Sequence, residues 1–233
     1  MKNKQQTAFL VLRMLEAQLE TDLTPSKELV YLHKSFAMFN VAALKKNAFN
    51  ILFVSLLLIL VFVPSAKAFM LRGLMEIGLF KPDAPLESNL GPAKDLSGIR
   101  FTDRQGKTVD LESLKGKVIF LNFWATWCPP CQAEMPSINK LYSQFKNDPK
   151  VVFLLVDADS DLPKAQKFLD KKKYDLPVYQ VASNIPEQLF KGSLPTTIVF
   201  DKKGRVSFNE EGAANYANQK FVDFILQLRD MEK

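Results

Sequence analysis

Apolar residues in this chain form one long uncharged run and several short blocks. The long run covers residues 48–63, and no polar face recurs in it every three or four positions. The blocks at 118–124 and 151–156 are apolar at nearly every position, which is typical of strands buried on both faces, as in parallel sheets. Helices are predicted after these blocks, to about residue 146 and over 162–172, the first broken or kinked at Pro136.

The rest of the pattern completes an α/β arrangement. Two short extended stretches flank residues 103–106, which predicts a β-hairpin. An extended piece follows at 177–181, and a second hairpin is predicted over 196–208. Asn215 is predicted to cap a last helix, whose apolar stripe consists of Phe221, Phe224, Ile225 and Leu228. This order of elements predicts an α/β fold with a central mixed sheet covered by helices.

The long apolar run is predicted to be an export segment. Lys45 and Lys46 precede it, so we expect the N-terminal side to stay in the cytoplasm and the following residues to be translocated. A run of this length is short for a spanning helix, which needs about 20 residues. The run ends in Ala66-Lys67-Ala68, an A-x-A pattern typical of signal-peptidase sites. A single-pass signal anchor is therefore favoured, with a signal peptide cleaved after Ala68 and a buried core helix as alternatives.

Four segments follow from these boundaries. Residues 1–47 are an N-terminal extension, 48–68 the signal anchor or signal peptide, 69–98 a linker, and 99–233 the globular domain. Met38 is an alternative start that would give a signal peptide of ordinary length and make the residues before it a gene-start artefact.

Charge argues against a nucleic-acid partner. The formal net charge is +6, and residues 1–68 carry eight Lys and Arg against four Asp and Glu. The remaining residues are nearly balanced, with 23 basic and 21 acidic side chains. The basic excess therefore lies mostly around the apolar run, and the globular part has no compositional sign of nucleic-acid binding.

The chain has only two cysteines, Cys128 and Cys131, separated by Pro129 and Pro130 directly after a predicted strand. If this motif begins a helix, backbone N–H groups and the helix dipole stabilise a thiolate at the first sulfur. A stabilised thiolate with a neighbouring thiol is the reactive pair of thiol–disulfide exchange. The motif therefore predicts a thiol–disulfide oxidoreductase.

Other interpretations of the cysteine pair agree less well with the sequence. A structural zinc site needs four ligands, but the chain has no other cysteine and its single histidine, His33, lies far upstream. Haem attachment requires a histidine where this chain has Gln132. A purely structural disulfide remains an alternative, although so small a loop stabilises little. We expect no metal and no cofactor.

The residues around the cysteines resemble a known family. The run Asn122-Phe123-Trp124-Ala125-Thr126-Trp127-Cys128-Pro129-Pro130-Cys131, Glu134-Met135-Pro136 and Leu194-Pro195-Thr196-Thr197 together resemble the TlpA/ResA-like branch of exported or membrane-anchored thioredoxins. The resemblance covers about residues 95–230. It implies a thioredoxin fold, here with an N-terminal β-hairpin extension and an N-terminal hydrophobic helix.

The resemblance also implies roles for individual residues. Cys128 would attack a substrate disulfide and Cys131 would resolve the mixed disulfide. Glu134 would take the proton of the resolving thiol, with a solvated, purely dipole-favoured glutamate as the alternative. Pro195 would be cis and hold the Leu194 backbone against the substrate.

The surface around the sulfurs would be shaped by Trp127, Pro129 and Pro130, the remaining candidate substrate-binding residues. Asn122 departs from thioredoxins proper, which carry a buried aspartate at this position. Because an amide cannot accept and release a proton, proton transfer would pass through Glu134, water or the partner.

The expected function is reduction of disulfides in extracytoplasmic proteins. The expected partners are disulfide-containing exported proteins, a membrane thiol donor, and the membrane itself through residues 48–63. A copper-handling or protein-binding module is one alternative. A peroxiredoxin-type peroxidase is a weaker one, because Leu121 and Ala125 stand where that family has Pro and Thr.

Overall fold

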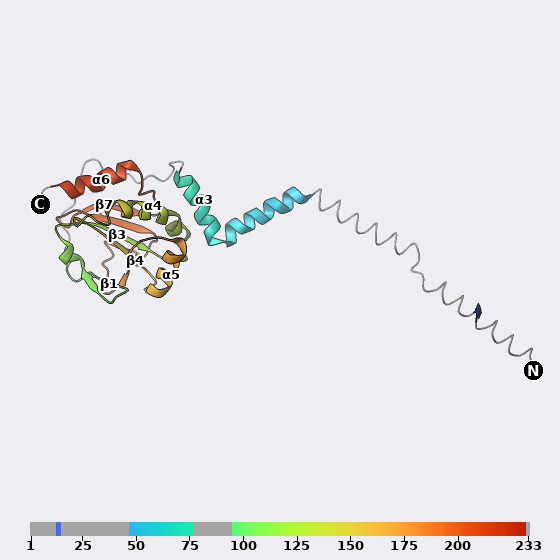
Figure 1. Ribbon diagram of the computed structural model, residues 1–233, viewed down its shortest axis with the longest axis horizontal. Coiled ribbons are helices and arrows are strands. Elements are labelled where there is room, and N and C mark those ends of the chain that lie inside the picture. Colours follow the sequence, from blue (N-terminus) through green and yellow to red (C-terminus); the bar gives the residue numbers. More distant parts are fainter. Residues whose placement is uncertain (1–12, 15–46, 77–94, 232–233) are drawn as a thin grey trace, which may run out of the picture. The chain divides into compact units, whose positions relative to one another are not determined.

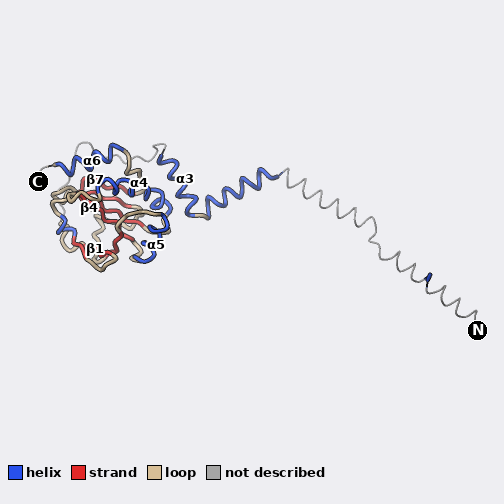
Figure 2. Tube along the Cα trace, in the orientation of Figure 1, coloured by secondary structure: helices blue, strands red, loops and turns tan. Residues whose placement is uncertain are grey.

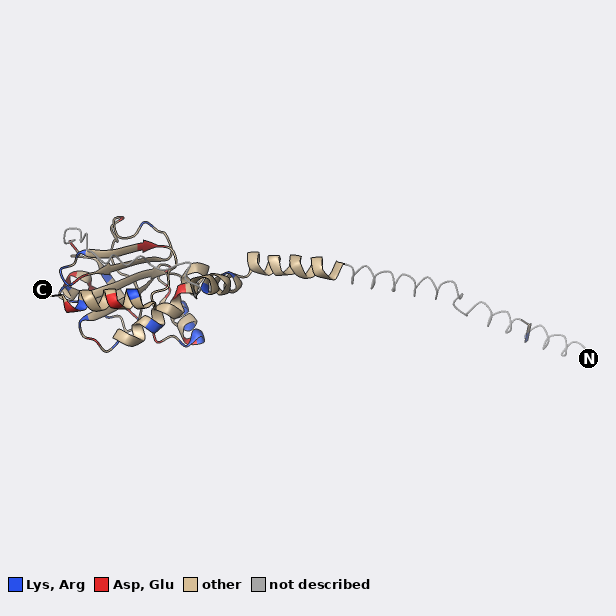
Figure 3. Cartoon of the chain, turned by 90° about the horizontal axis from the view of Figure 1, so that it is seen from above, with Lys and Arg blue, Asp and Glu red and all other residues tan. Residues whose placement is uncertain are grey.

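The computed structural model describes residues 13–14, 47–76 and 95–231, and the chain divides into two units, residues 1–58 and 59–233 (Figure 1). Most of the predicted N-terminal extension, including Met38, lies outside the described residues, as does most of the predicted linker. The apolar run forms a helix over Asn47–Phe62, and all of its large apolar side chains except that of Leu60 are exposed. This helix carries no Lys, Arg, Asp or Glu (Figure 3).

Among the described helices, none is by itself long and apolar enough to cross a membrane. The pair Asn47–Phe62 and Pro64–Met75, joined through a bend, satisfies the length and composition test together.

The second unit contains a seven-stranded mixed sheet (Figure 2). Its strands lie in the order β2-β1-β5-β4-β3-β6-β7. β3 pairs parallel with β4 and antiparallel with β6. The elements are β1 (Arg100–Asp103), β2 (Thr108–Asp110), the 3-10 turn η1 (Leu111–Leu114), β3 (Val118–Trp124), α4 (Pro129–Phe145), β4 (Val151–Asp157), α5 (Leu162–Lys172), β5 (Val178–Val181), β6 (Thr196–Phe200), β7 (Val206–Glu211) and α6 (Gln219–Asp230).

The central strand β3 is buried on both faces, which explains why its sequence is apolar without alternation. Val118, Phe120 and Trp124 face a core cluster that includes buried residues of α4, α5 and α6. Residues 119, 121 and 123 face a second cluster, which contains no residue of those three helices. The predicted mixed sheet covered by helices is confirmed, with α4, α5 and α6 packed on the same face.

Two local predictions at helices need correction. α4 is not broken at Pro136 but runs through it to Phe145, because a proline inside a helix removes one intrahelical hydrogen bond while the buried side chains on both sides of it keep the helix packed; the alternative of a kink at Pro136 stays a prediction. The cap of α6 is Asn218, whose side chain accepts a hydrogen bond from the Phe221 N–H at 3.0 Å. Asn215 instead accepts from the Ala217 N–H at 3.1 Å and so shapes the turn before the helix.

Residues 64–76, predicted to belong partly to the export segment and partly to the linker, form helix α3 (Pro64–Glu76). Ala68 and Met75 of α3 pack against Ala133 of α4. Arg72 adds a hydrogen bond from its Nη2 to the Gln132 carbonyl at 3.4 Å. α3 therefore lies along the helix that begins at the cysteine pair.

Candidate active site

The two cysteines form a disulfide at the beginning of α4. Cys128 is the N-cap of this helix, and its Sγ accepts a hydrogen bond from the Cys131 N–H at 3.2 Å. Pro129 and Pro130 occupy the first helical positions, where backbone N–H groups have no partner within the helix. The predicted placement of the motif at a helix N-terminus is confirmed, and a thiolate at Cys128 would face the positive end of the helix dipole.

The sulfur pair is largely covered by the protein. Cys128 is 3% exposed and Cys131 has no exposure, so Cys128 is the more accessible member. The turn before them is closed by two hydrogen bonds, from Cys128 N to the Ala125 carbonyl at 3.3 Å and from Gln132 Nε2 to the Thr126 carbonyl at 2.7 Å. These bonds hold the loop between β3 and α4 in one shape around the disulfide.

Glu134 lies one turn after Cys131 and is fully buried, so it is not a solvated glutamate. Its Oε1 accepts a hydrogen bond from Asn122 Nδ2 at 2.9 Å, and its Oε2 accepts one from the Ala214 N–H at 3.4 Å. Burial raises the pKa of the Glu134 carboxyl from 4.5 to about 8, and these two hydrogen bonds oppose the rise. The carboxyl therefore takes up and releases a proton near neutral pH, as a general acid–base group requires.

Asn122 joins this carboxyl to the sheet. It is fully buried on β3, opposite Thr197 in the register with β6, and its Nδ2 also donates to Thr197 Oγ1 at 2.9 Å. Within the described part of the chain, Asn122 Oδ1 has no hydrogen-bond partner. Where thioredoxins proper have an aspartate, this chain therefore has an asparagine whose amide N–H donates to Glu134.

Trp127 provides the exposed apolar surface next to Cys128. It is 57% exposed, and no other large apolar side chain in the described range 95–231 is comparably exposed. Its indole N–H donates to both carboxylate oxygens of Asp159, at 3.0 and 2.8 Å. Lys164 lies 3.5 Å from the same carboxylate. The indole is therefore held in place while its face stays open to a partner.

The peptide bond between Leu194 and Pro195 is cis, as the resemblance implied. Pro195 directly precedes β6, and its carbonyl accepts a hydrogen bond from Gly212 N at 2.8 Å. Leu194 packs against both core clusters, one of which contains the two cysteines. The loop before it is anchored by Phe190, whose ring stacks on Phe123 with centroids 4.2 Å apart.

The fold brings most of the predicted site residues together, and it adds others. Asp159 and Ala214 contribute to the site but were not among the predicted residues. The sequence signal for Asp159 was an acidic residue just after β4, and Ala214 had no such signal. Among the described residues, no group of three or more His, Cys, Asp or Glu side chains could hold a metal ion.

Comparisons with known proteins agree with this geometry. The family model described as Redoxin matches residues 91–222. A thiol-disulfide oxidoreductase ResA of Bacillus cereus is 40% identical over 116 residues, which are 48% of this chain and 65% of the relative. A second ResA, from another Bacillus cereus strain, is 35% identical over 140 residues, 58% of this chain and 79% of the relative. The chain thus spans just under two thirds of the first relative and more of the second.

Solved structures share the fold. A crystal structure from Chlorobium tepidum, described as that of a DsbE thiol:disulfide interchange protein, has a TM-score of 0.50 at 23% identity. The match covers 60% of this chain and 99% of that one. A structure assigned as a thiol-disulfide oxidoreductase of Bacteroides vulgatus has a TM-score of 0.50 at 26% identity, over 61% and 99% of the two chains. The chain belongs to the redoxin family and has ResA thiol-disulfide oxidoreductases among its relatives.

Proposed function

We propose that this protein is a ResA-type thiol–disulfide oxidoreductase that reduces disulfides in extracytoplasmic proteins. The observation that carries the proposal is the disulfide Cys128–Cys131 at the N-terminus of α4, one turn before the buried carboxyl of Glu134. The structure holds the oxidised form, which is the product of a reductase half-reaction. The names of the ResA relatives support the same activity.

The first step is attack by Cys128. In the reduced enzyme, the Cys128 thiolate, stabilised at the helix N-terminus, attacks one sulfur of the substrate disulfide. A mixed disulfide forms between Cys128 and the substrate, and the other substrate sulfur leaves as a thiolate that takes up a proton. Trp127 and the Leu194–Pro195 segment are the surfaces against which the substrate would bind.

The second step is resolution by Cys131. Glu134 removes the proton of the Cys131 thiol, and the resulting thiolate attacks Cys128 Sγ, which closes the enzyme disulfide and releases the second substrate thiolate. Two electrons have then passed to the substrate. The high pKa of Glu134 in the oxidised form suits this step, because the carboxyl keeps the proton that Cys131 gives up. A membrane thiol donor would return two electrons and restore the dithiol.

The predicted location is outside the cytoplasm. The helix Asn47–Phe62 carries no charge, exposes most of its apolar side chains and, together with Pro64–Met75, satisfies the length and composition test for a membrane span; these features support a membrane anchor. With Lys45 and Lys46 on the cytoplasmic side, the catalytic domain would lie in an extracytoplasmic compartment, where disulfides persist.

The test combines a trapping experiment with a redox titration. Cys131→Ser should accumulate mixed disulfides with client proteins through Cys128, and Cys128→Ser should accumulate none. A reduction potential of the Cys128–Cys131 pair near about −270 mV, together with insulin reduction, would support a reductase. A potential near about −120 mV would indicate an oxidant, and tight Cu(I) binding without disulfide reduction would replace the proposal by a copper-handling module.

A further inference from the structure

Helix α3 has two stripes of mostly apolar residues on opposite sides. The inner stripe, which contacts α4, consists of Ala68, Leu71, Arg72 and Met75. The outer stripe repeats the same spacing two positions earlier and consists of Ala66, Phe69, Met70 and Gly73. Residues spaced i, i+3, i+4 and i+7 share one face of a helix. Because each residue turns the helix by about 100°, the two stripes point in nearly opposite directions.

The inner stripe fixes α3 beside the helix of the cysteine pair. Its apolar members pack against Ala133 of α4, and Arg72 Nη2 donates to the Gln132 carbonyl at 3.4 Å. Inside an α-helix this carbonyl would accept from the N–H of residue 136, but that residue is Pro136, which has none. The proline in α4 therefore leaves an acceptor that α3 fills, directly after Cys131 in the sequence.

The outer stripe is apolar and exposed. Phe69 is 76% exposed and Met70 48%, and a side chain at Gly73 would meet nothing within 4 Å. In the described range 95–231, Trp127 beside the cysteine pair is the one comparably exposed large apolar side chain. A surface helix in water normally presents polar residues on the side away from the protein. An outer face without any polar side chain therefore indicates a second apolar neighbour.

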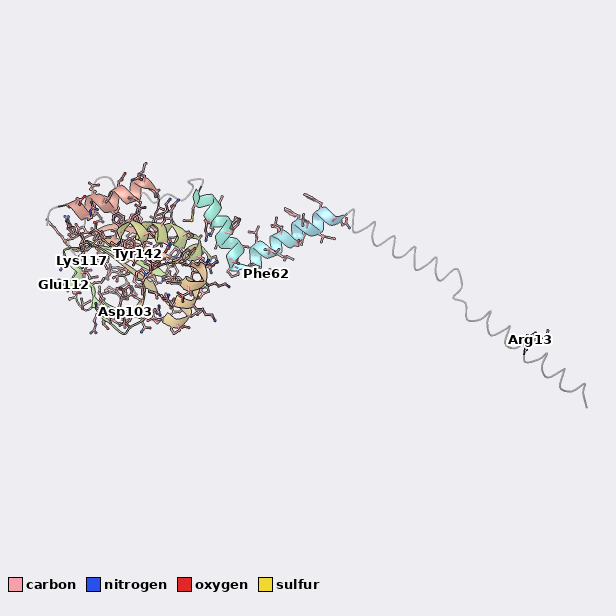
Figure 4. All side chains as sticks on the ribbon, viewed as in Figure 1. Arg13, Phe62, Asp103, Glu112, Lys117 and Tyr142 are labelled. Carbon is pink, nitrogen blue, oxygen red and sulfur yellow. A yellow bond between two sulfur atoms is a disulfide. The ribbon has the colours of Figure 1, made fainter. Side chains whose placement is uncertain are left out.

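The chain before α3 identifies this neighbour as lipid. A single residue, Val63, separates α3 from the uncharged helix Asn47–Phe62, and Figure 4 shows Phe62 where the two helices meet. Any apolar phase that takes up the exposed side chains of that helix therefore begins at the first turn of α3. The only charged residues between positions 47 and 75 are Lys67 and Arg72. Both are basic, as in helices that lie on anionic membrane surfaces.

We propose that α3 lies in the membrane interface, with its outer stripe in lipid and its inner stripe on α4. The axes of two packed helices lie about 10 Å apart, so the cysteine pair at the start of α4 is held close to the bilayer surface. The inference shares the anchor at residues 47–62 with the proposed function. It adds a second lipid contact, which fixes the catalytic domain at the membrane and presents it to a membrane thiol donor.

The experiment places a fluorescent probe on the outer stripe of the full-length protein. Phe69→Trp is compared with Lys172→Trp, an exposed position at the end of α5, in vesicles of phosphatidylcholine with about 25% phosphatidylglycerol. Bromine atoms on the acyl chains quench tryptophans that contact lipid, and the wild type in the same vesicles gives the contribution of Trp124 and Trp127. The added tryptophan at position 69 should lose about half of its emission or more, and that at position 172 less than about a tenth.

Substitutions at the neighbouring position of the stripe test its apolar character. In the Phe69→Trp background, Met70→Asp puts a charge on the outer stripe and should reduce the quenching at least several-fold, whereas Met70→Leu should preserve it. Neither substitution touches the inner stripe, so α3 keeps its contacts with α4 in both variants.

Three results would overturn the inference. Equal quenching at positions 69 and 172 would mean that the outer stripe has no special contact with lipid. A tryptophan at position 69 that neither bromolipids nor aqueous iodide quench would mean that protein covers the stripe. A chain that does not float with the vesicles would contradict the anchor at residues 47–62 as well, so flotation separates failure of the proposed location from failure of this inference. Disulfide reduction needs no vesicles and is tested independently.

Discussion

Replacing Glu134 by Gln tests the electrostatics of the site through protein stability. Gln has nearly the shape of a protonated Glu but does not ionise. In the folded oxidised protein the pKa of Glu134 is raised from 4.5 to about 8 by burial. Between these pH values the folded protein keeps a proton that the unfolded chain has released. The free energy of unfolding of the wild type should therefore fall as pH rises from about 4.5 to about 8.

The size of the effect follows from the same displacement. A pKa shift of this size lowers the free energy of unfolding by roughly 3 to 5 kcal/mol between about pH 4.5 and about pH 8. Gln also places an amide group near the Ala214 N–H, which costs about 1 kcal/mol at every pH. The diagnostic quantity is therefore how steeply the free energy of unfolding changes with pH, and not the constant difference between the two proteins. At about pH 5 the two proteins should have similar free energies of unfolding, and at about pH 9 the Gln variant should be the more stable by a few kcal/mol.

The assay is equilibrium unfolding in urea of the oxidised proteins across this pH range, followed by the fluorescence of buried Trp124. The cysteines are joined in a disulfide and do not titrate, and every other ionisable group is common to both proteins. The difference between the two curves therefore reports Glu134 alone. Parallel curves would refute the reasoning, since they would mean that the carboxyl ionises in the folded protein as it does in water.

Three further changes test other contacts of the site. Trp127→Ala should raise KM for a protein disulfide several-fold and leave the free energy of unfolding within about 0.5 kcal/mol, because the side chain is mostly exposed; an unchanged KM would exclude the indole from the substrate surface. Asn218→Ala should cost about 1 kcal/mol in urea unfolding and Asn215→Ala less; the reverse order would contradict the cap of α6. Phe190→Leu removes the ring stacked on Phe123 and should cost roughly 1 kcal/mol; a neutral result would mean that this stack does not hold the loop.

Strand and helix bounds were largely predictable where local signals were strong. The strand 118–124 and the helix 162–172 have the predicted bounds. A run that is apolar at every position except Asn122 defines the first, and a capping aspartate followed by a proline defines the start of the second. The cap of the last helix was placed wrongly, because Asn215 and Asn218 carry the same local signal. Tertiary packing decides between them, since the buried position of Phe221 fixes where α6 begins.

The sequence by itself determined the chemistry available to this protein: two cysteines one helical turn apart after a buried strand, with an acidic residue one turn further on. Only the tertiary structure decided how that acid behaves. Its partners Asn122 and Ala214 come from positions 12 and 80 residues away, on β3 and on the segment before α6. The proton affinity of a carboxyl depends on how far it is removed from water and on the dipoles around it, and distant segments supply both only when the chain is folded.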